Sequence, residues 1–309
     1  RWPDHHRLSR LAPQQRHAYT CVMKLATYCN RIGYRGPAEP TLQVLGDLLR
    51  AHVLRVPFEN LDVQLGRPTT IDPEAAFDKI VNRNRGGWCY EQNGLFGWAL
   101  SEIGFDVTRV AAAVMRADRG RIADNNHLAL LVRVDDQTWL VDVGFGGSLV
   151  APIQLRDGEY DQAPFRLGLR QLEAGNWQFW EDAGDGEFSF DFAAKAADEA
   201  ALDSKCRYLQ TSADSSFVLN LVSQLRQPNA HTTLRGKVFS QASPGGIATR
   251  ILESPDELVT TLREAFGLDV PEIADLWPRI EHRHAELMRE KELTDTYEIR
   301  SRSHNKPLG

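Results

Sequence analysis

Cysteine is scarce in this chain, and long apolar runs are missing from it. The only four cysteines are Cys21, Cys29, Cys89 and Cys206, and no two of them form a CxxC pair. A disulfide scaffold and a cysteine-based zinc site are therefore excluded, and an HExxH metal motif is also missing. No apolar run approaches the roughly 18 residues that a membrane span needs. We expect no metal, no tightly bound cofactor and no membrane partner.

An excess of positive charge is also lacking. The net charge of −6 and the pI near 5.9 argue against a nucleic-acid partner. A hydrophobic content of 42% and a charged content of 25% are those of an ordinary globular protein, and a length of 309 residues suggests two or three domains. The first residues, RWPDHH, do not resemble a signal peptide. We therefore expect a cytoplasmic protein with reduced thiols, and the sequence leaves its oligomeric state open.

Hydrophobic periodicity divides the chain into three regions of an α+β protein. Residues 1–84 predict a helical bundle, with one helix ending near Gly33, a second through residues 42–52, and a third that has Asp72 as N-cap and Pro73 at its first position. From about Val107 the hydrophobic period changes to two, and the region 85–192 is predicted to hold an antiparallel barrel or sandwich. The expected strands are Val107–Met115, His127–Val134, Thr138–Val143, Phe165–Leu172, Trp177–Trp180 and Phe188–Phe192.

Residues 193–309 mix helices and strands. Residues 193–205 predict a helical connector, and Phe217–Leu225 and Thr232–Phe239 predict strands. The run SPDE, which begins at Ser254, is a capping box that predicts a helix closed by Gly267. Another helix is expected over Arg279–Leu293, followed by a frayed end over Tyr297–Gly309.

Residues 85–93 read RGGWCYEQN and place Cys89 where a glycine turn becomes a helix. Two adjacent glycines predict a tight turn with positive φ angles, and an apolar stripe at helical spacing follows. In the first turn of that helix, free N–H groups and the helix dipole favour a thiolate. Cys89 is therefore a candidate nucleophile, and a buried structural cysteine is the alternative interpretation.

A hairpin further along supplies a base and a carboxylate. If Asp135 and Asp136 form a two-residue turn, Val134 pairs with Gln137, and Asp142 then stands opposite Ala129. His127 lies on the same face as Ala129, about 7–8 Å diagonally from Asp142, which side chains can bridge. Cys89, His127 and Asp142 are therefore the best candidates for a catalytic triad.

The other histidines are weaker candidates. His52 lies near the apolar face of its helix and is expected to be a satisfied core residue, and His231 follows Pro228 in a predicted turn. The remaining histidines fall in polar terminal segments: His5, His6, His17, His282, His284 and His304.

Five segments resemble, in order, the motifs of the arylamine N-acetyltransferases. They are RIGYRG at residues 31–36, VPFENLD at 56–62, RGGWCYEQN at 85–93, NHL at 126–128 and LVDVGFGG at 140–147. The similarity is close over residues 28–155 and looser to about residue 270. It implies a papain- or transglutaminase-like arrangement of a helical bundle (1–84), a β-barrel domain with the triad (85–192) and an α/β lid with a C-terminal helical tail (193–309).

The resemblance also implies an activity and a pocket. Its members use acetyl-CoA as co-substrate and donor, and arylamines, arylhydrazines or N-hydroxyarylamines as acceptors. The implied triad falls on Cys89, His127 and Asp142. The implied substrate-binding residues fall on Phe58, Phe145, Gly146 and Phe217.

Two segments depart from the family pattern. Residues 210–217 read QTSADSSF and lack a histidine and a proline that many relatives have before the phenylalanine, and residues 116–120 read RADRG where a glycine near the donor site is usual. Basic residues in the third region could meet donor phosphates or form a solvated face. They are Lys205, Arg207, Arg235 and Lys237.

The expected mechanism is a ping-pong acetyl transfer. An imidazolium–thiolate pair of His127 and Cys89 would attack the thioester and then pass the acetyl group from cysteine to an amine. Trp88 is a further candidate to line an aromatic pocket, although Trp88, Phe58 and Phe145 are each just as plausible as core residues. Arg85 and Glu59 are expected to form a buried ion pair that braces the cysteine turn. Two alternatives remain open, an intramolecular amide synthase that needs no CoA and a thiol hydrolase.

Overall fold

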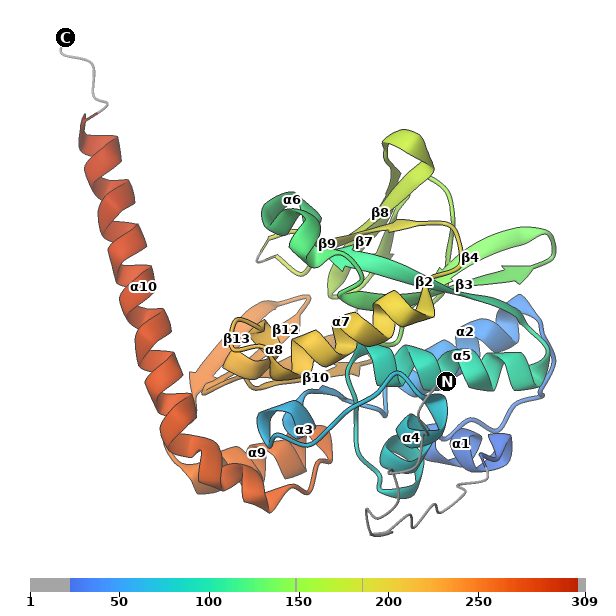
Figure 1. The fold of residues 1–309 in the computed structure, drawn as a ribbon, viewed down its shortest axis with the longest axis horizontal. Coiled ribbons are helices and arrows are strands. Elements are labelled where there is room, and N and C mark those ends of the chain that lie inside the picture. Colours follow the sequence, from blue (N-terminus) through green and yellow to red (C-terminus); the bar gives the residue numbers. More distant parts are fainter. Residues whose placement is uncertain (1–22, 148, 185, 305–309) are drawn as a thin grey trace, which may run out of the picture.

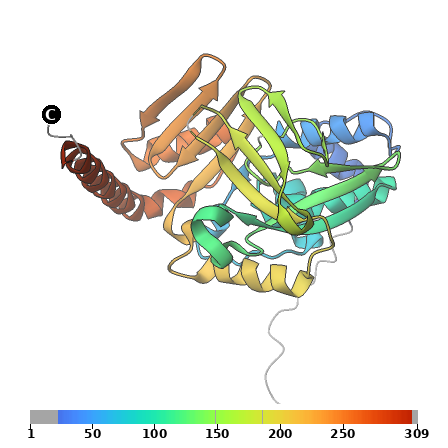
Figure 2. The ribbon, with the colours of Figure 1, turned by 90° about the horizontal axis from the view of Figure 1, so that it is seen from above.

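The computed structural model describes residues 23–304 except 148 and 185. It contains a helical part, a barrel and a second sheet flanked by helices (Figures 1 and 2). In both views the helix α10 (Trp277–His304) extends away from the rest of the molecule. Among the described residues, no helix is both long enough and apolar enough to cross a membrane.

The helical part follows the predicted start and stop signals. Its helices are α1 (Leu25–Ile32), α2 (Leu42–Val53), α3 (Leu61–Gln64), α4 (Pro73–Phe77), the π-helical turn η1 (Asp78–Asn82) and α5 (Cys89–Ile103). Gly33 ends α1 with φ 69°, and the Asp72 carboxylate caps α4 by accepting the Glu74 N–H, so both predicted boundaries are confirmed. The part of the first predicted helix before residue 23, and Cys21, lie outside the described residues.

The predicted barrel is confirmed as an antiparallel sheet of eight strands in the order β5-β4-β3-β2-β9-β8-β7-β6. The strands are β2 (Asp106–Val114), β3 (His127–Val134), β4 (Gln137–Val141), β5 (Ile153–Gln154), β6 (Gly158–Gln162), β7 (Phe165–Gln171), β8 (Asn176–Asp182) and β9 (Phe188–Ala193). The Gln162 side chain on β6 accepts the N–H groups of Val150 and Ala151 just before β5, which nearly closes the barrel.

The β3–β4 hairpin has the predicted register. Val134 pairs with Gln137 and Leu130 with Val141. Asp135 and Asp136 take φ angles of 49° and 60°, which are the two positive values of a type I′ turn. This register brings His127 and Asp142 to the same end of the hairpin.

The third region holds a five-stranded antiparallel sheet in the order β1-β10-β11-β12-β13. Its strands are β1 (Phe58–Glu59), β10 (Val222–Gln227), β11 (Ala230–Arg235), β12 (Val238–Ser243) and β13 (Gly246–Ile251), and its helices are α7 (Glu199–Thr211), α8 (Ser216–Leu219), α9 (Pro255–Phe266), the 3₁₀ turn η4 (Pro271–Leu276) and α10. Because β1 comes from the N-terminal region, this sheet joins distant parts of the chain.

Several predictions for this region were wrong. Phe217–Leu225 begins as the helix α8, which the Ser215 hydroxyl caps, and Thr232–Phe239 is two strands because Gly236 turns the chain with φ 56°. The chain is helical through His304, so the expected fraying of residues 297–304 is also wrong. By contrast, α9 begins after Ser254 and ends at Gly267 as predicted.

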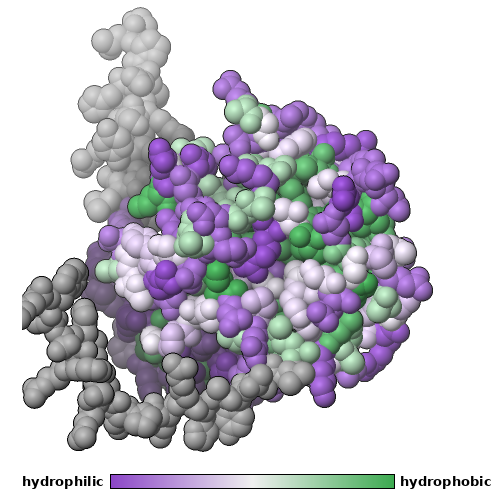
Figure 3. Space-filling model, turned by 45° about the vertical axis from the view of Figure 1, so that its right-hand side comes forward, coloured by the Kyte–Doolittle hydropathy of each residue, from purple (hydrophilic) through white to green (hydrophobic). Residues whose placement is uncertain are grey.

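The buried side chains place the site between two larger cores. One core joins α1, α2, α5 and the barrel, and another joins the second sheet to α9 and η4. A smaller cluster that includes Phe58, Trp88 and Cys89 lies where these parts meet. The outer face shown in Figure 3 mixes hydrophilic and hydrophobic side chains.

Candidate active site

Cys89 is the first residue of α5 and is 2% exposed. The turn before it is held by backbone hydrogen bonds from Glu59 N–H to the Gly87 carbonyl and from Gly87 N–H to the Pro57 carbonyl. The Glu91 carboxylate accepts the Trp88 N–H at 3.2 Å, which caps the start of the helix. The predicted position of Cys89 in the first helical turn is thus confirmed.

The two glycines of the turn serve close packing, and the prediction of positive φ angles for them was wrong. Neither is among the positive-φ glycines of the described chain. A Cβ on Gly86 would lie 2.1 Å from the Pro57 carbonyl oxygen, and one on Gly87 would lie 2.9 Å from the Glu91 carboxylate. Glycine is needed here because the neighbouring backbone and side chain leave no room for a larger residue.

His127, at the start of β3, and Asp142, just after β4, form a buried hydrogen-bonded pair. His127 Nε2 lies 2.5 Å from Asp142 Oδ2, and the two residues are 2% and 1% exposed. The other ring nitrogen, Nδ1, does not contact Asp142, and Cys89 lies near enough to the ring to raise its pKa. Cys89 Sγ in addition lies 4.0 Å from the Asn126 carbonyl oxygen. The three side chains therefore form one row.

The surroundings of His127 favour its protonated form. Burial alone would lower the pKa of the ring, but the charge and hydrogen bond of Asp142, together with Cys89, raise the pKa of His127 to about 10. The ring is thus a cation at neutral pH. A cationic imidazole next to the sulfur stabilises a thiolate, which is the reactive form of cysteine.

Asn93 positions the carboxylate and is a site residue for which sequence reasoning predicted no role. Its Nδ2 donates to Asp142 Oδ1 at 2.8 Å and to the Leu128 carbonyl at 2.6 Å, while its Oδ1 accepts the Val143 N–H. Asn93 lies four residues after Cys89, so both project from one face of α5. That spacing was the signal that could have identified it.

Gly144 lets the loop after Asp142 approach the nucleophile. A Cβ at this position would lie 2.6 Å from Cys89 Cα and 2.7 Å from Asn93 Nδ2. The Gly144 N–H also donates to Asp142 Oδ1 at 2.8 Å. A side chain at residue 144 would therefore push the carboxylate away from the cysteine helix.

A buried ionic cluster braces the cysteine turn. Arg85 Nη2 lies 2.8 Å from Glu59 Oε1, as predicted, and 3.3 Å from Asp62. Lys79 Nζ lies 2.9 Å from Glu91 and 3.0 Å from Asp62. Burial opposes ionisation of Asp62, but the nearby cations lower its carboxyl pKa, whereas burial raises the pKa of Glu91 despite Lys79. Sequence reasoning missed Asp62, Lys79 and Glu91 because nothing in their local pattern indicates burial.

A pocket of about 820 Å³, its open mouth included, leads to Cys89 and His127. Three of the predicted pocket residues, Phe58, Phe145 and Phe217, line it. The Phe145 ring centre lies 5.2 Å from that of His127 and stacks on Phe188 at 5.0 Å. The walls near the triad are therefore largely aromatic.

Two further expectations for the pocket have different outcomes. Gly146 does not line the pocket itself, but it contacts Gln224, which does, and its φ of 106° favours glycine. Trp88 is not among the lining residues, so the alternative interpretation of Trp88 as a core residue is confirmed. It packs edge-on against Phe217 and Tyr90 behind the pocket wall, since it is 1% exposed.

The remaining histidines and basic residues lie as follows. His52 is fully buried and hydrogen-bonds Tyr28 and Gln92, as expected of a core residue. His231 lies in β11, not in a turn, and its Nε2 donates to the Gly146 carbonyl at 2.6 Å.

Of the four basic candidates only Arg235 lines the pocket. The other three have partners elsewhere: Lys205 donates to the Ile122 carbonyl, Arg207 pairs with Asp203, and Lys237 pairs with Glu281. No group of potential metal ligands occurs among the described residues.

Comparison with known proteins points to one family. A family model described as N-acetyltransferase matches residues 41–275. The arylamine N-acetyltransferase of Mycobacterium tuberculosis is 34% identical over 267 residues, which cover 82% of this chain and 92% of that protein. The protein of the same name from Mycolicibacterium smegmatis is 34% identical over 269 residues, which cover 82% and 94%.

The fold agrees with these matches. The structure of the Mycobacterium marinum arylamine N-acetyltransferase in complex with CoA has a TM-score of 0.76 to this chain at 32% identity, and the match covers 84% of this chain and 98% of that one. The helical part, the barrel and the second sheet are therefore shared with a protein that binds CoA.

Proposed function

The chain belongs to the arylamine N-acetyltransferase family, and from this premise we propose that it moves an acetyl group from acetyl-CoA to an aromatic amine through Cys89. Arylhydrazines and N-hydroxyarylamines are acceptors of the same kind. One observation carries the proposal: Cys89, His127 and Asp142 form a buried row that opens into an aromatic pocket.

The first half-reaction uses the charge of His127. The Cys89 thiolate attacks the thioester carbonyl, and the N–H of Cys89, at the first position of α5, is placed to donate to the oxyanion. The bond to the CoA sulfur breaks, and His127 gives its proton to that sulfur. Free CoA leaves, and an acetyl-cysteine remains beside a neutral imidazole.

The second half-reaction restores the starting state. The amine attacks the acetyl carbonyl, His127 takes the proton from its nitrogen, and the Cys89 sulfur leaves as thiolate. Asp142 holds the ring through Nε2 in both steps and stabilises its positive charge. Phe58, Phe145 and Phe217 support an aromatic acceptor because their rings line the pocket, and Gly146 lets the backbone approach the pocket residue Gln224.

A thiol-release assay tests the reaction. With acetyl-CoA and anisidine, continuous release of CoA that requires the amine is the expected result. Release without amine would indicate a hydrolase, and no release with either would indicate an amide synthase that takes its acyl chain from another carrier. Either result would overturn the transferase.

Mass spectrometry of the enzyme tests the carrier. Incubation with acetyl-CoA alone should add one acetyl group to Cys89, and Cys89→Ser should abolish both this adduct and turnover. Cys29→Ser is the matched control, because Cys29 is a free, half-buried thiol of the helical part. An acetyl group on another cysteine would contradict the assignment.

We further propose that the protein works in the cytoplasm. Its three described cysteines are free thiols, as expected in a reducing compartment. Localisation of the tagged protein by cell fractionation tests this, and recovery outside the cytoplasmic fraction would contradict it.

A further inference from the structure

Two arginines line the same pocket as Cys89 and His127. Arg119 ends the short helix α6 (Arg116–Arg119) after β2, and Arg235 ends β11 in the second sheet. Both side chains are exposed, so they lie toward the solvent end of the pocket, whereas the triad lies at its buried end. They therefore face the entrance from two different parts of the fold.

Neither guanidinium has a hydrogen bond or an ion pair within the part of the chain that the structure describes. The neighbouring arginines of the same segment differ, because Arg116 and Arg121 both contact Asp124. Surrounding atoms that displace water, and then the charge of Arg119, lower the pKa of Arg235. Two like charges are thus held close together without a counter-charge on either of them.

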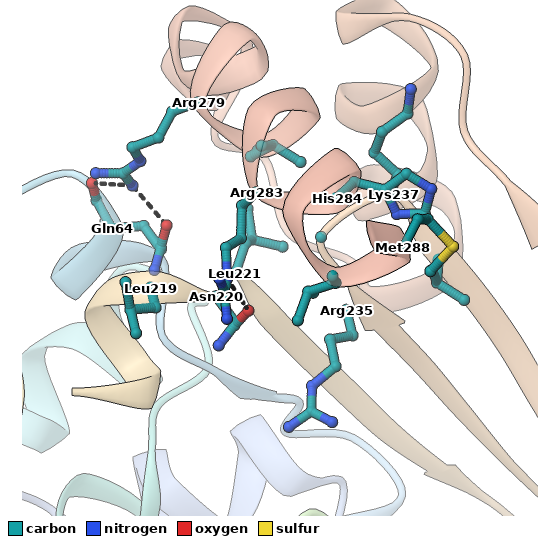
Figure 4. Close-up of a pocket in the computed structure, with 14 residues that line it drawn as sticks. Gln64, Leu219, Asn220, Leu221, Arg235, Lys237, Arg279, Arg283, His284 and Met288 are labelled. Atoms are coloured by element: carbon teal, nitrogen blue, oxygen red, sulfur yellow. Dashed lines mark hydrogen bonds between the residues drawn. The ribbon is translucent and has the colours of Figure 1, made fainter. Parts of the chain in front are cut away.

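The other basic side chains near Arg235 are already engaged. Figure 4 shows the adjoining pocket under α10, where Arg279 contacts Gln64 and Arg283 contacts Asn220. Lys237 pairs with Glu281 there. The Arg235 guanidinium points away from α10 in the same view. Its charge is therefore available to the Cys89 pocket.

We propose that Arg119 and Arg235 form an anion subsite at the entrance of the Cys89 pocket, which holds a phosphate or carboxylate of a substrate while its reactive end reaches the sulfur. An anion between the two guanidiniums removes their repulsion and supplies the missing charge-assisted hydrogen bonds. Glu181, which is 8% exposed, also lines the pocket.

The inference rests on the proposed function and gives it a substrate preference. A donor phosphate and an acceptor carboxylate offer the same oxygen chemistry. If α6 had only a conformational role, substitutions in it would change KM equally for charged and neutral substrates. A comparison of the two kinds of substrate therefore tests the proposal.

The experiment compares charged and neutral substrates in Arg119→Gln, Arg235→Gln and the double variant. The donor arm uses acetyl-CoA against the neutral acetyl thioester of N-acetylcysteamine, with anisidine as acceptor. The acceptor arm uses 4-aminobenzoate against its methyl ester, with the neutral thioester as donor. Arg121→Gln is the matched control, because its side chain is 92% exposed and lies on the same segment outside the pocket.

Each single variant should raise KM for the charged substrate by about tenfold or more, with kcat and the neutral KM unchanged. A rise confined to acetyl-CoA identifies a phosphate, and one confined to 4-aminobenzoate identifies a carboxylate. Equal changes for charged and neutral substrates, or no change, overturn the subsite. If the wild type does not turn over, the proposed function fails instead, and calorimetric binding of CoA to wild type and variants then decides the subsite alone.

Discussion

Three histidines of this protein are buried, but their pKa values are shifted in different directions because their hydrogen-bond partners differ. Burial lowers the pKa of His52 to about 3 and that of His231 to about 4, since their partners are neutral groups. His127 is equally buried, but the carboxylate of Asp142 raises its pKa to about 10. Charge on the partner thus outweighs the cost of removing water.

This contrast predicts the titration of His127. Nuclear magnetic resonance of ring-labelled histidines should show His127 protonated at about pH 8, where an ordinary imidazole with a pKa near 6.5 is neutral. His127→Gln assigns the signal, and His52 and His231 serve as neutral controls in the same spectrum. Titration of His127 near its ordinary value would contradict the imidazolium–thiolate pair.

The same shift has a consequence for stability. Because the folded pKa lies above the unfolded one, the pair contributes to the free energy of unfolding fully below about pH 6.5 and loses this contribution as the pH rises to about 10. His127→Gln should remove this part of the pH dependence of unfolding.

Asn93→Ala should impair catalysis through Asp142. The carboxylate loses a donor at 2.8 Å, and a hydrogen bond to a charged group contributes about 1.5–3 kcal/mol, so kcat/KM should fall by about tenfold to a hundredfold. The His127 titration should shift in the same variant, which a purely structural defect would not cause. Asn82→Ala, at an exposed asparagine, is the control. Unchanged titration of His127 would show that Asn93 does not position the pair.

At the level of elements, the buried ionic cluster joins η1, α3, α5 and β1 to the turn before the nucleophile. Lys79 from η1 contacts Glu91 from α5 and Asp62 from α3, and Arg85 contacts Glu59 from β1. All five side chains are nearly inaccessible to solvent. The pairs fix the turn before Cys89 because each charge depends on the others for compensation.

Lys79→Met should lower the free energy of unfolding by about 3–5 kcal/mol, because it takes the buried cation away from three buried carboxylates and leaves only Arg85 and the exposed Arg67 to compensate them. Urea unfolding measures the loss. Arg83→Met is the matched control, since the Arg83–Asp78 pair is exposed and should contribute less than about 1 kcal/mol. Equal losses in the two variants would refute the bracing role of the cluster.

Elements with strong local signals could be predicted from the sequence. The turn at Asp135 and Asp136 set the hairpin register, and Ser254 and Gly267 set the ends of α9. The short edge strands β5 and β6 were missed because β5 has only two residues and β6 is mostly polar. The cluster partners were missed because compensation among buried charges depends on tertiary contacts, which no local pattern encodes.

At the scale of the whole molecule, Asn60 fastens the N-terminal region to the second sheet. Its Nδ2 donates to the Phe217 and Asn220 carbonyls, and its Oδ1 accepts the Val222 N–H, each at 2.8 Å. Phe58, two residues earlier, pairs with Gln224 through β1 and β10. One wall of the pocket is therefore fixed to the cysteine turn by a fully buried amide.

Asn60→Ala should loosen this junction without altering the triad. Three hydrogen bonds at about 1 kcal/mol each predict a loss of about 3 kcal/mol in the free energy of unfolding. Hydrogen exchange at the Val222 amide should accelerate, and KM for the aromatic acceptor should rise because the Phe217 carbonyl keeps only one of its two side-chain donors, Gln64. Asn176→Ala, whose amide makes one contact at 3.3 Å in the barrel, should change neither quantity. Unaltered exchange at Val222 in Asn60→Ala would mean that the β1–β10 pairing and the Gln64 hydrogen bonds hold the second sheet in place without Asn60.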